Sequence, residues 1–281
     1  MSSFRERNDR KGRFSPRLDA EGADRRRGAP KGDEARGGEW IWGRHAVVAA
    51  LANPARAPLR RLLATQDALK TLQADPTLRR VLAESGLAPE TAGSNEIARL
   101  LPAGATHQGL ALAAQPLEPL GIDDVAEPAE GLLLVLDQVT DPQNVGAVFR
   151  SAAAFGARAV ILQDRHAPAF SGALAKAAAG ALETTPAVRV VNLARALERL
   201  SDLGWRTVGL AGEAETALAD ALVPGAPTVL VMGSEGEGLR RLVGENCEVL
   251  ARIPMPGGFE SLNVSAAAAI ALYEASKVSG R

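Results

Sequence analysis

The sequence of 281 residues lacks the features that several protein classes need. With Cys247 as its one cysteine, it cannot build a framework of disulfides. This lone thiol and the three scattered histidines also argue against a structural zinc site, so we expect no bound metal. No run of about 18 apolar residues is present, and no basic segment precedes an apolar one near the start. We therefore expect a cytoplasmic protein with neither a transmembrane helix nor a secretory signal.

The charge of the chain is nearly balanced overall but unevenly distributed. The net charge is −1, and 46% of the residues are hydrophobic, which is enough for a sizeable core. Residues 1–38 contain 11 basic and 7 acidic side chains and residues 40–115 contain 8 and 5, whereas residues 116–129 contain four acids and no base. The positive charge therefore lies toward the N-terminus, which weakly favours a partner that carries phosphates.

Shifts in composition divide the chain into four parts, the last of which is residues 131–281. Residues 1–38 contain few large apolar side chains, so we predict a disordered basic arm that either solubilises the protein or contacts RNA. Residues 39–115 have the pattern of a small α/β domain, and residues 116–130 are predicted to be an acidic linker with three prolines. In the small domain we predict helices at 43–52, 67–84 and 94–101, the last capped by Ser94, and strands at 59–64 and 109–114.

From residue 131 onward, strand patterns alternate regularly with helical ones. Strands that are apolar throughout and alternate with helices predict a parallel sheet covered on both faces. Ligands of such sheets bind beyond the carboxyl ends of the strands, so the loops after Leu136, Met232 and Ile253 are candidates for chemistry. The predicted strands are 132–136, 159–162, 188–191, 207–210, 228–232 and 249–253, and the predicted helices are 145–155, 171–182, 193–203, 239–243 and 264–278.

The first of these loops, Asp137–Gly146, leads into a helix that carries Arg150. Asn144 lies near the start of that helix, where a side-chain oxygen can cap the free N–H groups. Arg150 follows six residues later, about one and two-thirds turns into the helix. Asn144 and Arg150 are therefore either site residues or simply a helix cap and a surface charge.

The second loop, Met232–Gly238, contains glycines in the order G-x-x-G-x-G. This order differs from the dinucleotide fingerprint G-x-G-x-x-G, and no Lys-Ser or Lys-Thr pair follows to make a P-loop. A Rossmann-type dinucleotide enzyme is therefore disfavoured. Glu235 closely follows a strand that we expect to be buried, where a charge requires a partner. An acid at the start of a helix would explain the same residue.

The third loop, Ile253–Ser265, combines prolines with glycines and ends at an alanine-rich helix. Ser261, Asn263 and Ser265 offer hydroxyl and amide groups close to the start of that helix. Capping of the helix explains one of the three, which leaves the others available to a ligand.

Together the three loops resemble the motifs of SpoU/TrmH-class RNA 2′-O-ribose methyltransferases, in the SPOUT superfamily. The matching segments are Asp141–Gly146 with Arg150, Met232–Gly238, and Ile253–Met255 with Ser261–Ser265. In addition, Trp42–Ala46 and His107–Gly109 resemble the substrate-binding domain attached to RlmB-type enzymes, which act on a guanosine of 23S rRNA. The resemblance covers residues 40–281. It implies a small N-terminal α/β substrate-binding domain and a C-terminal α/β SPOUT domain whose parallel sheet contains a deep trefoil knot.

The resemblance also implies a cofactor and a partner. In the family, S-adenosyl-L-methionine (AdoMet) lies bent in the knotted loops, which on this chain places it against Gly233, Ile253, Met255 and Leu262. Members of the family are homodimers through the knotted domain, with each active site close to the other subunit. The helix that contains residues 264–275 is then an interface element, unless it is only part of the core.

Methylation of a ribose needs a 2′-hydroxyl that loses its proton as it attacks the methyl group of a sulfonium. That methyl group is already activated, so no metal is required. The resemblance assigns the catalytic role to Arg150, either as the base, although arginine holds its proton tightly, or as a clamp on a phosphate that also stabilises the developing alkoxide. Asn144 and Glu235 would orient Arg150 and the ribose, with Glu235 as an alternative proton acceptor. Ser261 and Asn263 would bind the target nucleotide or the methionine end of the cofactor.

The expected function is AdoMet-dependent 2′-O-methylation of a guanosine in 23S rRNA, free or in a ribosomal precursor, during ribosome maturation. One alternative is a tRNA ribose methyltransferase of the same class, and another is resistance-type methylation of 23S rRNA at a different position. A third is a catalytically silent relative that binds RNA as an assembly factor, which would have lost a motif residue, and none is lost here. Arginines of the small domain are either phosphate contacts or ordinary surface charges: Arg44, Arg56, Arg60, Arg61, Arg79 and Arg80.

Overall fold

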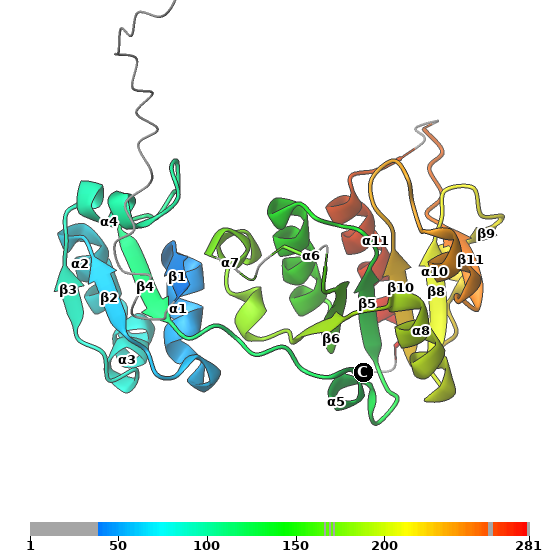
Figure 1. Cartoon of the computed structure of the whole chain (residues 1–281), viewed down its shortest axis with the longest axis horizontal. Helices are drawn as coiled ribbons and strands as arrows, with labels where there is room; N and C mark the ends of the chain where they lie inside the picture. The colour runs from blue at the N-terminus through cyan, green and yellow to red at the C-terminus, as the bar shows by residue number, and fades with distance from the viewer. Residues whose placement is uncertain (1–38, 166, 169, 171, 258–260, 280–281) are drawn as a thin grey trace, which may run out of the picture. The chain divides into compact units, whose positions relative to one another are not determined.

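The computed structural model describes residues 39–165, 167–168, 170, 172–257 and 261–279 (Figure 1). The arm predicted at residues 1–38 lies outside the described residues. The described residues all belong to one compact unit. Among them, no helix is both long enough and apolar enough to span a bilayer.

The N-terminal part is a four-stranded sheet with helices, in the order β1-β4-β2-β3. Strand β4 pairs antiparallel with β1 and β2, and β3 pairs parallel with β2. The small α/β fold predicted here is confirmed. Its elements are β1 (Glu39–Trp42), α1 (Arg44–Ala52), the 3-10 turn η2 (Pro54–Arg56), β2 (Arg61–Ala64), α2 (Gln66–Ala74), α3 (Pro76–Glu84), β3 (Pro89–Thr91), α4 (Ser94–Leu100) and β4 (Leu110–Ala114).

Two local predictions in this part were wrong. The single helix predicted at 67–84 is divided into α2 and α3, because Pro76 begins a new helix and the carboxylate of Asp75 accepts the N–H groups of Thr77 and Leu78. Ser94 is the first residue of α4 rather than its cap, since the residue before it, Gly93, occupies the cap position without a side-chain bond.

The C-terminal part is a seven-stranded sheet in the order β7-β6-β5-β10-β8-β11-β9. Every pairing in it is parallel, as the alternation of apolar strands and helices predicted. Strand β9 contains two residues at the edge of the sheet and was not predicted. The strands are β5 (Leu132–Leu136), β6 (Ala159–Gln163), β7 (Ala187–Val190), β8 (Arg206–Leu210), β9 (Thr216–Ala217), β10 (Thr228–Met232) and β11 (Val249–Arg252).

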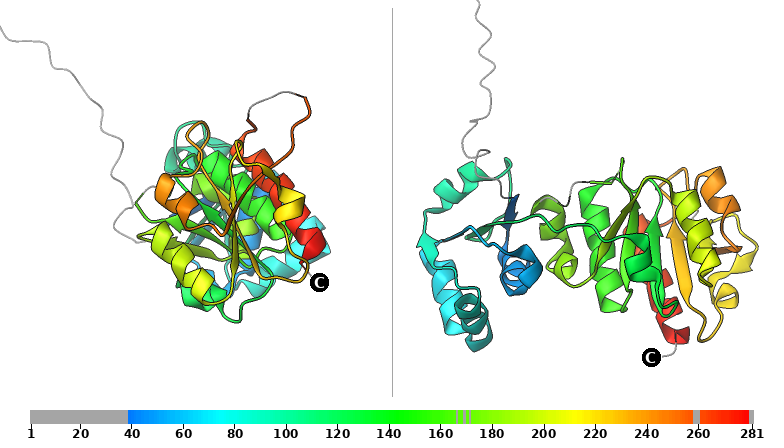
Figure 2. Two further views of the ribbon diagram at one scale, coloured as in Figure 1. Left: turned by 90° about the vertical axis from the view of Figure 1, so that its right-hand side faces the viewer. Right: turned by 60° about the horizontal axis from the view of Figure 1, so that its bottom comes forward.

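Helices cover both faces of this sheet, as the left view of Figure 2 shows. Alternate side chains of β5 divide between two buried clusters: Leu132, Leu134 and Leu136 pack on the side of α6, α7 and α11, and Leu133 and Val135 on the side of α8. The helical elements are α5 (Ile122–Ala126), α6 (Pro142–Ala154), α7 (Gly172–Ala178), η3 (Ala181–Glu183), α8 (Leu193–Asp202), α9 (Leu218–Ala221), α10 (Arg241–Glu245) and α11 (Val264–Val278).

Two features of the C-terminal part bear on the earlier predictions. Helix α5 lies in the interval 116–130, where we predicted only a linker, and Leu120 bridges to Val188 of β7. Helix α11 packs against α6 and β10, so the chain returns from β11 to the middle of the sheet. The trefoil knot itself stays a prediction.

Candidate active site

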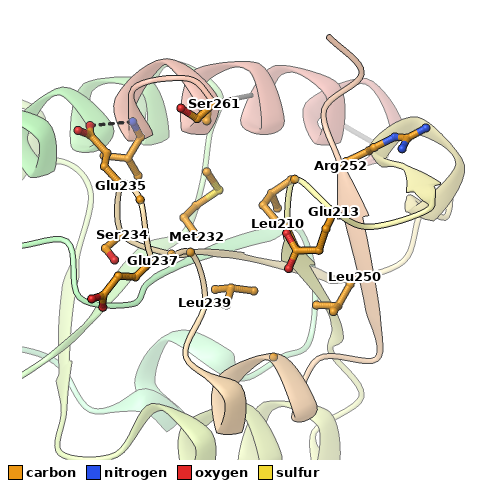
Figure 3. Close-up of a pocket in the computed structure, with 18 of the residues that line it drawn as sticks. Leu210, Glu213, Met232, Ser234, Glu235, Glu237, Leu239, Leu250, Arg252 and Ser261 are labelled. Atoms are coloured by element: carbon orange, nitrogen blue, oxygen red, sulfur yellow. Dashed lines mark hydrogen bonds between the residues drawn. The ribbon is translucent and has the colours of Figure 1, made fainter. Parts of the chain in front are cut away.

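Two of the three loops singled out in the sequence, those after Met232 and Ile253, line a cavity of about 730 Å³ at the carboxyl end of β10, and the loop after Leu136 supplies none of its described lining residues. Its walls include the apolar side chains of Leu210, Met232 and Leu239, with Glu235 and Ser261 beneath α11 (Figure 3). The residues predicted to touch the cofactor all line it: Gly233, Ile253, Met255 and Leu262. The motif resemblance therefore identified these four lining residues, whereas the sequence analysis did not single out the segment 210–213 at the end of β8, which also lines the cavity.

The glycine loop, Gly233–Leu239, is closed on itself. Ser234 and Gly238 exchange two backbone hydrogen bonds, each 3.1 Å from nitrogen to oxygen. A Cβ on Gly233 would lie 2.1 Å from the carbonyl carbon of Gly238, so no larger residue fits at that position. Gly236 has φ 88°, a value that glycine adopts without strain. The glycines thus fix a tight turn whose backbone faces the cavity.

Glu235 is exposed rather than buried, so burial did not require a partner for it, but its carboxylate is nevertheless held by three donors. Its Oε1 accepts hydrogen bonds from the Asn263 amide at 2.7 Å, the backbone N–H of Val264 at 3.1 Å and the Asn144 amide at 3.2 Å (one is dashed in Figure 3). The Asn263 amide also donates to Oδ1 of Asn144 at 3.0 Å. One side chain from each of the three loops therefore meets in a polar network, which we call the amide cluster: Asn144, Glu235 and Asn263.

Helix caps account for only part of these residues. Asn144 does not cap α6, because the carboxylate of Asp141 takes the N–H groups of Gln143 and Asn144 at 3.2 and 3.3 Å. That correction frees the Asn144 side chain for the amide cluster. Asn263 does cap α11, since its Oδ1 accepts from the N–H of Ser265 at 2.9 Å, while its amide group serves the cluster.

The structure does not bring Arg150 and Ser261 into the amide cluster. Arg150 is exposed on α6, does not line the cavity, and makes no hydrogen bond or ion pair with the described residues. Ser261 lines the cavity but is exposed and likewise makes no side-chain hydrogen bond within the described part of the chain. Within one chain, the predicted catalytic set is therefore three joined residues and two separate ones.

The sequence analysis did not identify an ion pair beside the glycine loop whose carboxylate is buried. Asp137, the residue after β5, is fully buried, and its Oδ1 lies 2.7 Å from Nη2 of Arg240. The signal was available, because a charged residue directly after an apolar strand requires a partner, as argued for Glu235. Nothing in the sequence showed that the partner would follow the glycine loop.

One predicted phosphate contact was wrong. Arg56 is fully buried and forms a two-pronged ion pair with Glu183, at 2.8 Å from Nη2 to Oε1, so it cannot reach a phosphate. Of the other arginines, Arg44, Arg79 and Arg80 are exposed, and Arg80 pairs with Glu84. The sequence could not separate these cases, since a buried arginine and a surface arginine leave the same local pattern.

The motifs at His107–Gly109 and Gly43 meet in space. Gln108 accepts a hydrogen bond from the backbone N–H of Arg44 at 3.1 Å and one from the ammonium group of Lys176, on α7, at 2.5 Å. His107 is buried and accepts from the N–H of Gly109 at 3.1 Å. The conformation of both motifs is thus fixed by bonds to each other and to α7.

Two family models match the chain. The SpoU rRNA Methylase family matches residues 131–273, and the model described as RNA 2′-O ribose methyltransferase substrate binding matches residues 40–120. Proteins named 23S rRNA (guanosine-2′-O-)-methyltransferase RlmB are similar throughout: that of Photobacterium profundum is 42% identical over 84% of this chain and 96% of its own, and that of Ralstonia nicotianae is 42% identical over 83% and 93%.

Solved structures of similar proteins agree. An AdoMet-bound rRNA methyltransferase from Sinorhizobium meliloti superposes with a TM-score of 0.70 at 25% identity, over 87% of this chain and 88% of its own. A putative RNA methyltransferase of the TrmH family from Porphyromonas gingivalis gives a TM-score of 0.67 at 28% identity, over 84% and 88%.

Proposed function

The chain belongs to the SpoU rRNA methylase family, and from this premise we propose that it transfers the methyl group of AdoMet to the 2′-hydroxyl of a guanosine in 23S rRNA. The observation that carries the proposal is the meeting of the three motif loops in the amide cluster, beside a cavity that two of them line. The relatives named for this activity match both parts of the chain. We place the reaction in ribosome maturation in the cytoplasm, on free 23S rRNA or on a ribosomal precursor.

The cavity fits AdoMet in size and chemistry. Its volume of about 730 Å³ lies within the roughly 300–1,000 Å³ that is usual for small-molecule and cofactor sites. Leu250 and Leu262 line it and leave 40% and 38% of their surface exposed, which a bound adenosine group would cover. Charged side chains of both signs also line it, among them Glu213, Glu237, Arg241 and Arg252. This mixture suits a ligand that carries both a positive sulfonium and a carboxylate. AdoMet would supply a methyl group already activated on a positively charged sulfur.

The residues of the chain then have to hold the ribose and manage its proton. The amide cluster fixes Glu235 at the cavity wall, and Ser261 has a free hydroxyl there for the nucleotide or the methionine end of the cofactor. Arginine is not deprotonated in proteins, which makes a base a poor role for any arginine, and the Arg150 guanidinium is exposed, where a phosphate can reach it. We therefore assign Arg150 the role of a clamp that binds a phosphate of the RNA and stabilises the developing alkoxide.

A homodimer would supply the clamp where one chain lacks it. Arg150 lies on the exposed side of α6, and the adjacent α11 exposes Ile270 and Tyr273, 38% and 51% of whose surfaces are accessible. Large apolar side chains on a neighbouring surface favour an interface. We propose that α6 and α11 form the contact between two copies, which brings Arg150 of one subunit to the amide cluster of the other.

We propose the same division of the chain as the composition suggested. Residues 39–115 would be the RNA-binding domain, residues 116–130 the link, and residues 131–281 the knotted methyltransferase domain, with residues 1–38 as a basic arm. Matches of separate family models at 40–120 and 131–273 support this division.

The direct test uses tritiated AdoMet with unmethylated 23S rRNA, 16S rRNA and bulk tRNA, followed by separation of the nucleosides. We expect label in 23S rRNA alone, as 2′-O-methylguanosine. Label in tRNA would retain the chemistry and overturn the substrate. No label in any RNA, from a protein that binds AdoMet, would favour either a ribosomal precursor as the substrate or the silent RNA-binding relative.

The variant Arg150→Lys tests the clamp in the same assay. Lysine keeps the charge but loses the planar fork that binds phosphate at two points, so we expect turnover to fall by about 100-fold while AdoMet binding is unchanged. Near-normal methylation by this variant would exclude an essential Arg150.

A further inference from the structure

The glycine loop is held at both ends by one residue. The backbone N–H of Asp137 donates to the carbonyl of Met232, the residue before the loop, at 2.8 Å. The Asp137 carboxylate accepts from the backbone N–H of Arg240, the residue after the loop, at 2.9 Å. Asp137 belongs to neither end of the loop, since it follows the neighbouring strand β5. Residues 233–239 are therefore closed across the end of the sheet by a third segment.

The side chain of Arg240 completes this closure. Its Nε donates to Oδ1 of Asp137 at 2.8 Å, and its Nη2 donates to Oε1 of Gln163, the last residue of β6, at 2.8 Å. The Gln163 amide in turn donates to the carbonyl of Val191, just after β7, at 3.3 Å. A chain of polar contacts thus runs across the ends of four adjacent strands. We call this chain the loop latch: Asp137, Arg240 and Gln163.

The loop latch contains a buried charge, which is more than the closing of a turn requires. The Asp137 carboxylate is fully buried, and burying an ion costs several kcal/mol unless a partner compensates for it. The Asp137 charge also acts on a neighbouring thiol. Burial, and to a smaller extent the charge of Asp137, raise the pKa of Cys247 to about 12. Arg240 is 38% exposed and lines the cavity.

From this geometry we propose that Asp137, Arg240 and Gln163 are positioning residues, which hold the glycine loop in the shape that binds AdoMet. The proposal rests on the proposed function, because it takes AdoMet as the ligand of the cavity. The amide cluster fixes the tip of the loop at Glu235, and the loop latch fixes its base. Loosening the base moves the backbone that lines the cavity but leaves the amide cluster in place. The loop latch therefore sets cofactor affinity rather than the rate of methyl transfer.

The test compares Arg240→Lys and Gln163→Met with the wild type and with Arg206→Lys as a matched control. Like Arg240, Arg206 pairs with a carboxylate, that of Glu248. It also donates to the backbone carbonyl of Ala221 at 3.1 Å. It lies at the start of β8, the opposite end of the strands, and does not line the cavity. AdoMet binding by calorimetry, and kcat at saturating AdoMet with 23S rRNA, are measured on the full chain of each.

We expect Arg240→Lys to weaken AdoMet binding about tenfold, equivalent to ~1.4 kcal/mol, and to change kcat by less than about threefold. Gln163 does not line the cavity, so any loss of affinity in Gln163→Met acts through Arg240, and we expect a smaller loss of about threefold. Arg206→Lys should bind AdoMet like the wild type. If Arg240→Lys fails to fold, Gln163→Met decides.

Two results would overturn the inference while leaving the proposed function intact. One is unchanged AdoMet affinity in both loop-latch variants, and the other is a loss of kcat at saturating AdoMet with affinity unchanged. A wild-type protein that does not bind AdoMet at all would overturn the proposed function together with the inference.

Discussion

In the described part of the chain, two buried carboxylates, Glu183 and Asp137, each pair with an arginine, and the two pairs differ in what surrounds them. Arg56 and Glu183 are 0% and 3% exposed, and Glu183 also accepts from the Asn53 amide at 2.7 Å. Asp137 is equally buried, but its partner Arg240 leaves 38% of its side chain exposed on the cavity. The first pair is sealed, whereas the second opens onto a binding site.

The exposure of the arginine in each pair indicates the role of that pair. The sealed pair joins η2 of the N-terminal part to η3 of the C-terminal part. The remaining guanidinium nitrogen of Arg56, Nη1, donates to the carbonyl of Gln115 at 3.0 Å. Because the sealed pair leaves no surface for a ligand, its effect is on the contact between these two parts of the fold. The open pair holds a loop that a ligand touches. A change in the first should therefore appear in stability, and a change in the second in affinity.

The largest effect is expected from breaking the sealed pair. Glu183→Gln leaves the Arg56 charge buried without its hydrogen-bonded counter-charge, which we expect to reduce the free energy of unfolding by about 3–5 kcal/mol. Urea denaturation measures this loss, and calorimetry should show AdoMet affinity unchanged for the protein that remains folded. The double variant Arg56→Met with Glu183→Leu should recover most of the stability, because it removes both charges. If Glu183→Gln weakened AdoMet binding as much as Arg240→Lys does, the contrast between the pairs would fail.

A third carboxylate, that of Glu235, differs from those of Glu183 and Asp137 because amide groups rather than an arginine hold it. Glu235→Gln keeps an oxygen for its donors, so we expect a small change in stability. If Glu235 accepts the ribose proton, kcat should fall by about 100-fold or more, with AdoMet affinity kept. Single-turnover methylation of 23S rRNA measures this rate. A loss below about fivefold would limit Glu235 to orienting the ribose.

How much of this could be predicted from sequence depended on the range of the interaction. Strands β5 and β10 and helix α11 were predicted at their observed bounds, since long apolar or alanine-rich runs determine them locally. Strand β9 and helix α5 were missed, because two and five residues are too short to show a period.

The site divides in the same way. The place of Glu235 after a strand predicts a buried charge, but the side chain is exposed, and its partner Asn144, 91 positions away, became visible only through the motif resemblance. The break at Asp75–Pro76 was a local signal that the apolar period concealed. Burial of Arg56 depends on Glu183, 127 positions away, so no local pattern separates it from its exposed neighbours.

The smallest effect concerns Glu39, a second acid at the sealed pair. Burial raises the pKa of the Glu39 carboxyl above its ordinary value of 4.5; the charge of Arg56 opposes this rise and that of Glu183 adds to it. The folded state therefore binds this proton more readily than the unfolded state does. That advantage is present below pH 4.5 and is lost as the pH rises through the folded pKa, so at pH 7 the Glu39 charge destabilises the protein.

Glu39→Gln removes this charge and should stabilise the protein at pH 7 by less than about 1 kcal/mol, because the group is partly solvated. The gain should vanish near pH 4, where the wild-type carboxyl is itself protonated. Urea midpoints of both proteins at the two pH values measure it. Glu90→Gln is the control, since Glu90 lies in the same sheet, is 52% exposed and pairs with Arg61, so its loss should bring no gain. A less stable Glu39→Gln at pH 7 would mean that attraction to Arg56 outweighs burial, and the sealed pair would then be a triad with Glu39 as its third member.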